Sequence, residues 1–195
     1  MKKASEVRKA DHPIELALLE RWSPRAMTGE PIPMEELLPL FEAARWAPSS
    51  GNAQPWRLLY ARRETEQWPL FFDLLMEGNK LWVKNAALLV LFISRSLAEN
   101  TGKPSVTHSF DTGAAWENFA LQGNAQGLVV HGMQGFDYEK AKTVLQIPEY
   151  FRVEAMVAVG RSAPLTVLPE ALQAREVPSD RRKLKDSMCE GVFRL

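Results

Sequence analysis

Residues 86–94 read AALLVLFIS, an apolar run with β-branched and aromatic members that ends at a serine. Such a short and uniform run indicates a strand buried on both faces, because a half-exposed strand alternates apolar and polar side chains. A strand buried in this way belongs to a sheet that other elements cover from above and below. The stretch therefore predicts a layered domain of strands and helices.

The segments on either side support this layered arrangement. The expected helices cover residues 14–22, 34–46, 68–76, 111–127 and 138–145, and the other expected strands cover 56–61, 128–133 and 154–160. Pro39 lies inside the second of these helices, where proline removes a backbone hydrogen bond, so we expect a kink or a later start there. Strands that alternate with helices indicate an α/β or α+β domain.

The helix expected at 111–127 is unusual because many of its residues are small. These residues are Gly113, Ala114, Ala115, Ala120, Gly123 and Ala125. Small side chains allow another backbone to approach closely, so we expect this helix to be central in the fold or to lie at a subunit contact. Asp111, at its start, is interpreted as an N-cap rather than as a catalytic acid.

Length and charge limit the classes of protein that the chain can belong to. Its 195 residues are 46% hydrophobic and 25% charged, which predicts a single globular domain over residues 1–195. Twenty-four basic residues balance 24 acidic ones, so the chain lacks the basic excess of a nucleic-acid-binding protein. The zero net charge leaves self-association open.

Metal, membrane and export signals are absent from the sequence. Cys189 is the only cysteine, and the three histidines are scattered without ligand spacing, so we expect no metal site. The longest apolar run has eight residues, far below the roughly 20 that a membrane-spanning helix needs. Residues 1–13 contain no apolar segment typical of a secretion signal. We therefore expect a cytoplasmic protein that does not bind membranes.

The C-terminal extension, residues 161–195, differs from the rest of the chain. It contains three prolines, a basic cluster at residues 181–185 and little helical periodicity. Such a segment cannot form a core of its own, so it is either disordered or wraps over a folded body. Its apolar end, with Val192, Phe193 and Leu195, favours wrapping. The basic cluster, taken alone, is typical of a solvated surface.

Residues 21–25, RWSPR, close the first expected helix. Arg21 and Arg25 flank Ser23, and two guanidinium groups with a hydroxyl between them can bind an anion. The alternative is a helix end whose arginines complement the helix dipole. Spacing alone favours the helix-end interpretation and leaves the anion site open.

Residues 48–56, PSSGNAQPW, form a second polar motif. Four polar side chains in six positions, on a path fixed by glycine and proline, can present donors and acceptors to a flat heterocycle. Amides suit an isoalloxazine ring, whose carbonyls need donors and whose ring N–H needs an acceptor. The alternative is a helix-ending turn of ordinary composition.

Together, these two motifs resemble the FMN-dependent nitroreductase family in order and spacing. Further segments agree in register: EGNKLWVKNA at 77–86, DTGAA at 111–115, GLVVHGMQGFD at 127–137 and VGR at 159–161. The resemblance extends from about residue 14 to the C-terminus. It implies an α+β fold with three α/β/α layers and a mixed central sheet. It also implies a homodimer with FMN at the subunit interface and a C-terminal tail that wraps the partner subunit.

The resemblance assigns five groups of residues to the cofactor. They are Arg21, Trp22, Ser23 and Arg25; Pro48, Ser49, Ser50, Asn52 and Gln54; Asn79; His131 and Gly132; and Arg181, Arg182 and Lys183. The first group would hold the phosphate, the ribityl chain and the pyrimidine side of the flavin. The second would reach the flavin from the other subunit, the third and fourth would lie near the ring, and the fifth would contact the phosphate.

Two positions depart from the family pattern: Trp22 is larger than the polar residue that is usual there, and the second position is Trp82. Some members carry a lysine near the N1 and O2 edge of the flavin, where this chain aligns Trp82. Arg25 would then supply the positive charge at that edge and stabilise the negative charge that develops on reduction. No side-chain nucleophile is expected, because the chemistry belongs to the cofactor.

The implied activity is a ping-pong reduction of small electrophiles such as nitroaromatics or quinones, with NADH or NADPH as the hydride donor. Two alternatives remain. One is a family branch with dehalogenase or flavin-fragmenting chemistry, and the other is a flavin-binding or regulatory protein without turnover.

Overall fold

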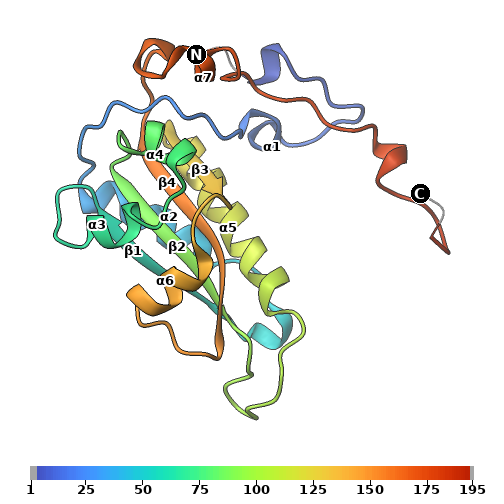
Figure 1. Cartoon of the computed structure of the whole chain (residues 1–195). Helices are drawn as coiled ribbons and strands as arrows, with labels where there is room; N and C mark the ends of the chain where they lie inside the picture. The colour runs from blue at the N-terminus through green and yellow to red at the C-terminus, as the bar shows by residue number, and fades with distance from the viewer. Residues whose placement is uncertain (1–3, 194–195) are drawn as a thin grey trace.

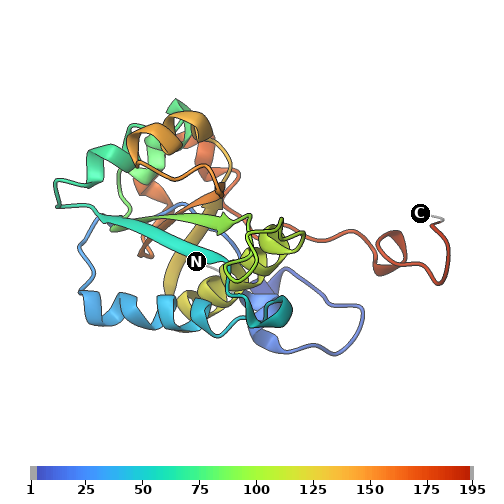
Figure 2. The same cartoon turned by 90° about the horizontal axis from the view of Figure 1, so that it is seen from below.

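The computed structural model describes residues 4–193 and shows three layers around one sheet (Figures 1 and 2). Helices α2 (Met34–Arg45) and α5 (His108–Ala125) cover one face of the sheet. The other face carries α3 (Trp68–Phe72), α4 (Glu77–Val83) and α6 (Tyr138–Val144). This arrangement confirms the expected α+β fold with α/β/α layers.

The sheet has four strands in the order β1-β2-β4-β3. Their bounds are Trp56–Arg62, Leu88–Arg95, Phe151–Arg161 and Leu128–Met133, given in that spatial order. Every neighbouring pair within the described residues is antiparallel, rather than mixed as expected. The reason lies in the connection: the crossover through α5 leaves a gap between β2 and β3, and β4 fills that gap in the opposite direction.

Strand β2 is buried on both faces, as its uniform apolar sequence predicted. Leu89, Leu91 and Ile93 belong to the core cluster beneath α3, α4 and α6. The alternate residues Leu88, Val90 and Phe92 belong to the cluster beneath α2 and α5. The two-residue period of the strand thus divides one apolar run between two cores.

Helix α5 is central within the chain, which confirms one of the two roles expected from its small residues. Ala115 and Ala120 are buried against α2 and the sheet. Gly123 approaches β3 so closely that an added Cβ would lie 2.3 Å from the Val130 Cγ2 atom. The second role, a subunit contact, stays a prediction.

We expect Gly123→Ala to destabilise the fold by about 1–3 kcal/mol, because the new methyl group overlaps Val130 in a packed core. Gly78→Ala in α4 is the matched control, since its Cβ would meet no atom within 4 Å. That change should be neutral or stabilising by up to about 1 kcal/mol through helix propensity. Urea unfolding measures both, and equal effects of the two substitutions would contradict the packing argument.

Several boundaries differ from the sequence-based expectations. Helix α2 begins at Met34 and continues through Pro39, because Leu37 and Leu40 are fully buried and hold the helix against the core. The expected helix at 68–76 ends at Phe72, and α4 follows as a separate helix. Helix α1 is limited to Leu16–Glu20. The short helices that complete the fold are Ala4–Glu6, Ser50–Asn52, Leu165–Val167, α7 at Glu170–Gln173, and Leu184–Asp186.

The C-terminal extension divides into two parts. Up to residue 180 it wraps over the body of its own chain, with Ala163, Leu168 and Glu176 buried. Residues 181–193 are exposed throughout and project away from the body (Figures 1 and 2). Leu195, part of the predicted apolar end, lies outside the described residues. Among the described residues, no helix combines the length and apolar character needed to cross a membrane.

Candidate cofactor site

The segment 21–25 and the C-terminal extension meet in one pocket of about 280 Å³. Ten residues line it: Arg8, Arg21, Trp22, Ser23, Arg25, His131, Arg175, Val177, Ser179 and Arg181. Six of these were assigned to the cofactor from the sequence, namely Arg21, Trp22, Ser23, Arg25, His131 and Arg181. The two ends of the chain therefore converge at one site, and we call it the arginine pocket.

The arginine pocket carries a large excess of positive charge. Among the described residues, five arginines line it, and no aspartate or glutamate does. Two of the arginines have acidic partners outside the lining: Arg21 Nε lies 3.1 Å from Glu117 Oε1, and Arg25 Nη1 lies 3.3 Å from Glu176 Oε2. A small concave site with this charge is suited to a multiply charged anion.

Arg8 also lines the pocket, although it was not predicted from the sequence. Its guanidinium donates to three backbone carbonyls, those of Leu19, Arg21 and Ser179, at 3.0, 2.9 and 2.8 Å. These bonds join the N-terminal segment, the end of α1 and the C-terminal extension. Burial, followed by the nearby Arg181 and Arg21 charges, lowers the pKa of Arg8. No local pattern marks this residue, since it lies in a polar segment without periodicity.

His131, which was expected near the flavin ring, reaches the arginine pocket from β3 through its side chain. Nδ1 lies 2.9 Å from the Pro24 carbonyl oxygen, which can only accept, so Nδ1 carries the proton. Burial is the largest cause that lowers the pKa of His131. The ring also packs on Trp82, with centroids 4.6 Å apart. Trp82 is thus a buried support for His131 and does not line the arginine pocket.

We expect the stability of the protein to fall more steeply below about pH 6.5 than that of the His131→Gln variant. Because the pKa of His131 is lowered in the folded state, its contribution is present above the unfolded pKa and is lost as the pH falls. Urea unfolding between pH 5 and 8 measures how the free energy of unfolding changes with pH in each protein. The two proteins differ only in His131, so all their other titrating groups are the same. Parallel slopes would show that His131 titrates as it does in the unfolded chain.

The polar motif at 48–56 lies away from the arginine pocket, beside the N-terminal end of α5 (Figure 1). None of its residues, including Pro48, Ser49, Asn52 and Gln54, lines that pocket. Gly51, Asn52 and Gln54 have positive φ angles of 57°, 54° and 47°. Because Asn52 and Gln54 carry side chains, these angles indicate a loop that its surroundings hold in a strained shape.

Asp111 holds this loop, which corrects its interpretation as an N-cap. Helix α5 begins at His108 with Thr107 in the capping position. The buried Asp111 carboxylate accepts hydrogen bonds from the Ser50 N–H at 3.2 Å and from the Thr107 hydroxyl at 3.0 Å. The sequence suggested a polar residue at a helix start, but not that the helix begins one turn earlier.

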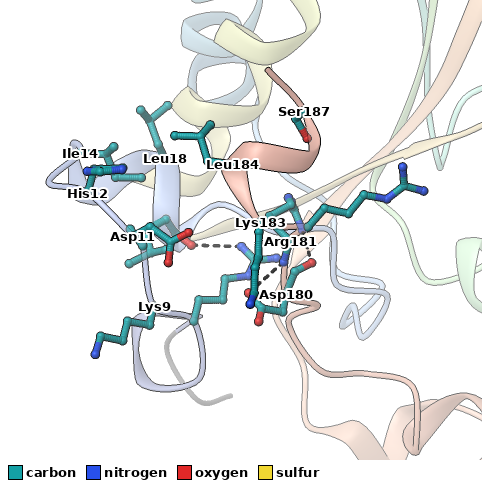
Figure 3. Close-up of a pocket in the computed structure, with 14 residues that line it drawn as sticks. Lys9, Asp11, His12, Ile14, Leu18, Asp180, Arg181, Lys183, Leu184 and Ser187 are labelled. Atoms are coloured by element: carbon teal, nitrogen blue, oxygen red, sulfur yellow. Dashed lines mark hydrogen bonds between the residues drawn. The ribbon is translucent and has the colours of Figure 1, made fainter. Parts of the chain in front are cut away.

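The other assigned residues lie outside the arginine pocket. Asn79 donates from its side-chain amide to the Gly135 carbonyl at 3.0 Å. Gly132 faces Trp116, whose ring leaves little room for a side chain there. Arg182 and Lys183 line a neighbouring cavity of about 600 Å³ between the N-terminal segment and the tail (Figure 3), which Arg181 also borders.

Residues 18–161 match the model of the nitroreductase family. The chain belongs to the nitroreductase family. This match spans the 21–25 segment and the strand that carries His131, which supply half of the residues that line the arginine pocket.

Individual relatives agree with the family assignment. A crystal structure of an oxidoreductase containing FMN is 47% identical, covers 96% of each chain and has a TM-score of 0.91. An FMN-dependent nitroreductase from Clostridium difficile R20291 shares the fold at 21% identity, with a TM-score of 0.62 over 74% of this chain and 85% of its own. A protein named NADH dehydrogenase from Thermus thermophilus is 26% identical over 75% of this chain and 85% of its own length.

Proposed function

We propose that this chain is an FMN-dependent oxidoreductase that takes hydride from NADH or NADPH and reduces small electrophiles such as nitroaromatics or quinones by a ping-pong mechanism. The observation that carries the proposal is the arginine pocket, in a chain of the nitroreductase family. The 47% identical relative described as containing FMN supports the choice of cofactor.

The residues of the arginine pocket fit the phosphate group of FMN. That phosphate carries close to two negative charges and three acceptor oxygens. Arg21, Ser23 and Arg181 would supply donors to it from two sides of the pocket. Arg8 already donates to backbone carbonyls, so it would contribute charge and hold the walls together.

Arg25 and His131 would act on the flavin side of the site. When bound, FMN supplies two-electron hydride transfer between the nicotinamide and the acceptor. Arg25 would place positive charge at the N1 and O2 edge, where negative charge develops on reduction. His131, uncharged and fixed through the Pro24 carbonyl, would present an unprotonated Nε2.

The remaining ring contacts would come from a second copy of this chain. No residue of the Ser49–Gln54 loop lines the arginine pocket of its own chain, so the loop would serve the partner subunit's flavin. Exposed apolar side chains in α1 and the tail, among them Leu16 and Met188, would be covered in such a homodimer. Residues 181–193 would then wrap the partner subunit.

The first test of this proposal is the identity of the bound chromophore. Protein purified without added flavin should release a yellow compound that comigrates with FMN, at about one per chain. Release of FAD alone, together with no affinity for added FMN, would refute the proposal.

A second test separates an enzyme from a flavin carrier. Under anaerobic conditions, NADPH or NADH should bleach the flavin absorbance within seconds, and a nitroaromatic or a quinone should restore it. A protein that keeps its colour with both donors is a binding protein without turnover. A panel of acceptors then identifies the preferred substrate class.

A further inference from the structure

Glu176 is a buried acid in the C-terminal extension, just after α7. Its side chain has no exposed surface, although its neighbours Arg175 and Val177 are exposed. Within the described residues, Glu176 and Asp111 are the only carboxylates that are buried. A buried carboxylate is costly unless hydrogen bonds and opposite charge compensate it, so its partners indicate what it does.

Both carboxylate oxygens of Glu176 accept hydrogen bonds from the 21–26 segment, which forms the opposite wall of the arginine pocket. Oε1 accepts hydrogen bonds from two successive backbone N–H groups, those of Arg25 and Ala26, the latter at 2.8 Å. Oε2 accepts from Arg25 Nη1 at 3.3 Å. One carboxylate therefore fixes the backbone and the guanidinium of the same residue.

The residues around Glu176 show why this contact matters for the site. Arg175, Val177, Ser179 and Arg181 line the arginine pocket, whereas Glu176 is directed the other way, into the protein. Alternate residues of the extension thus line the pocket, while Glu176 between them binds the interior of the protein. Because Glu176 binds Arg25 and Ala26, it fixes the position of the C-terminal extension relative to residues 21–26.

We propose that Glu176 is the positioning residue of the cofactor site: it holds Arg25 in the orientation that receives the anionic cofactor. This proposal rests on the proposed function, because it takes FMN as the anion. Glu176 does not line the arginine pocket and acts through Arg25, which it contacts. Removal of the Glu176 charge has two opposing effects on FMN affinity. It relieves repulsion of the anionic cofactor, which strengthens binding, and it releases Arg25, which weakens binding.

The test is Glu176→Gln in the full chain, after removal of flavin, with the FMN dissociation constant measured by fluorescence titration. Glutamine keeps the shape and one acceptor oxygen but loses the charge that holds Arg25. We expect the dissociation constant to rise about tenfold or more. Glu170→Gln, at an exposed acid of α7, removes the same charge and should leave the constant unchanged. Unchanged or tighter binding by Glu176→Gln would make Glu176 a simple counter-ion.

A double-mutant cycle with Arg25→Ala distinguishes positioning from a general structural role. If Glu176 acts through Arg25, the Glu176→Gln change should cost less than about twofold once Arg25 is gone. Full additivity of the two changes would overturn the proposal. Thermal melting and gel filtration of each variant show that the comparison is made between folded proteins.

Hydrogen exchange of the unsubstituted protein tests the same contact if the Gln variant fails to fold. The Arg25 and Ala26 amides should exchange slowly without flavin, because Glu176 accepts from both. Fast exchange at these two positions would show that this contact does not form. Failure of the unsubstituted protein to bind FMN would instead refute the proposed function. The hydrogen-exchange result does not depend on FMN, so the two failures can be distinguished.

Discussion

Replacing Arg21 and Arg181 together with alanine is expected to weaken FMN binding by about a hundredfold or more. Each arginine lines the arginine pocket from a different end of the chain. A lost charge-assisted hydrogen bond costs about 1.5–3 kcal/mol, so two of them reach this factor. Titration of flavin-free protein with FMN measures the loss. The loss should be larger at low salt than at high salt, because exposed ionic contacts are screened.

The charge-matched control is the Arg182→Ala, Lys183→Ala variant. It also removes two positive charges, from the residues next to Arg181, but those residues line the neighbouring cavity and not the arginine pocket. We expect its FMN affinity to stay within about threefold of the original, since only long-range attraction is lost. Equal losses of FMN affinity in the two variants would mean that the basic residues attract FMN only through long-range charge. The arginine pocket would then not be the specific phosphate site.

The layered fold could be predicted from the sequence because burial leaves a simple signal. The apolar run of β2 and the exact span of β3 at 128–133 both follow from side-chain pattern. The antiparallel position of β4 could not be read in the same way, since a strand covered on both faces looks alike in either direction. Pairing depends on which strand enters the gap left by the α5 crossover, and that is a property of the whole fold.

Sequence motifs predicted some of the residues that line the arginine pocket. The RWSPR segment and Arg181 line the same pocket, although they lie near opposite ends of the chain. Their supports were not predictable. Arg8 and Glu176 act on backbone groups of distant segments, through contacts with sequence separations of 171 and 151 residues. Such contacts leave no local spacing for a reader of the sequence to recognise.

Subunit complementation is expected to restore activity from two inactive variants. The first carries Arg21→Ala and Arg25→Ala in the arginine pocket, and the second carries Asn52→Gly and Gln54→Gly in the loop beside α5. Glycine suits the loop because both positions have positive φ angles, so the backbone is kept while the side chains are removed. Each homodimer alone should be inactive, because every site in it lacks one half of its contacts.

After subunit exchange, each heterodimer collects both defects in one site and leaves the other site with unaltered residues from both chains. Random exchange makes half of the dimers heterodimers, so about a quarter of the original activity should return. The measurement is nitroaromatic reduction before and after exchange, with the heterodimer fraction followed by mass. Confirmed exchange without recovered activity would place the loop and the arginine pocket of one chain in the same site. The shared site also predicts that neither variant binds FMN tightly alone, since one lacks the pocket arginines and the other lacks the loop side chains that would contact the ring.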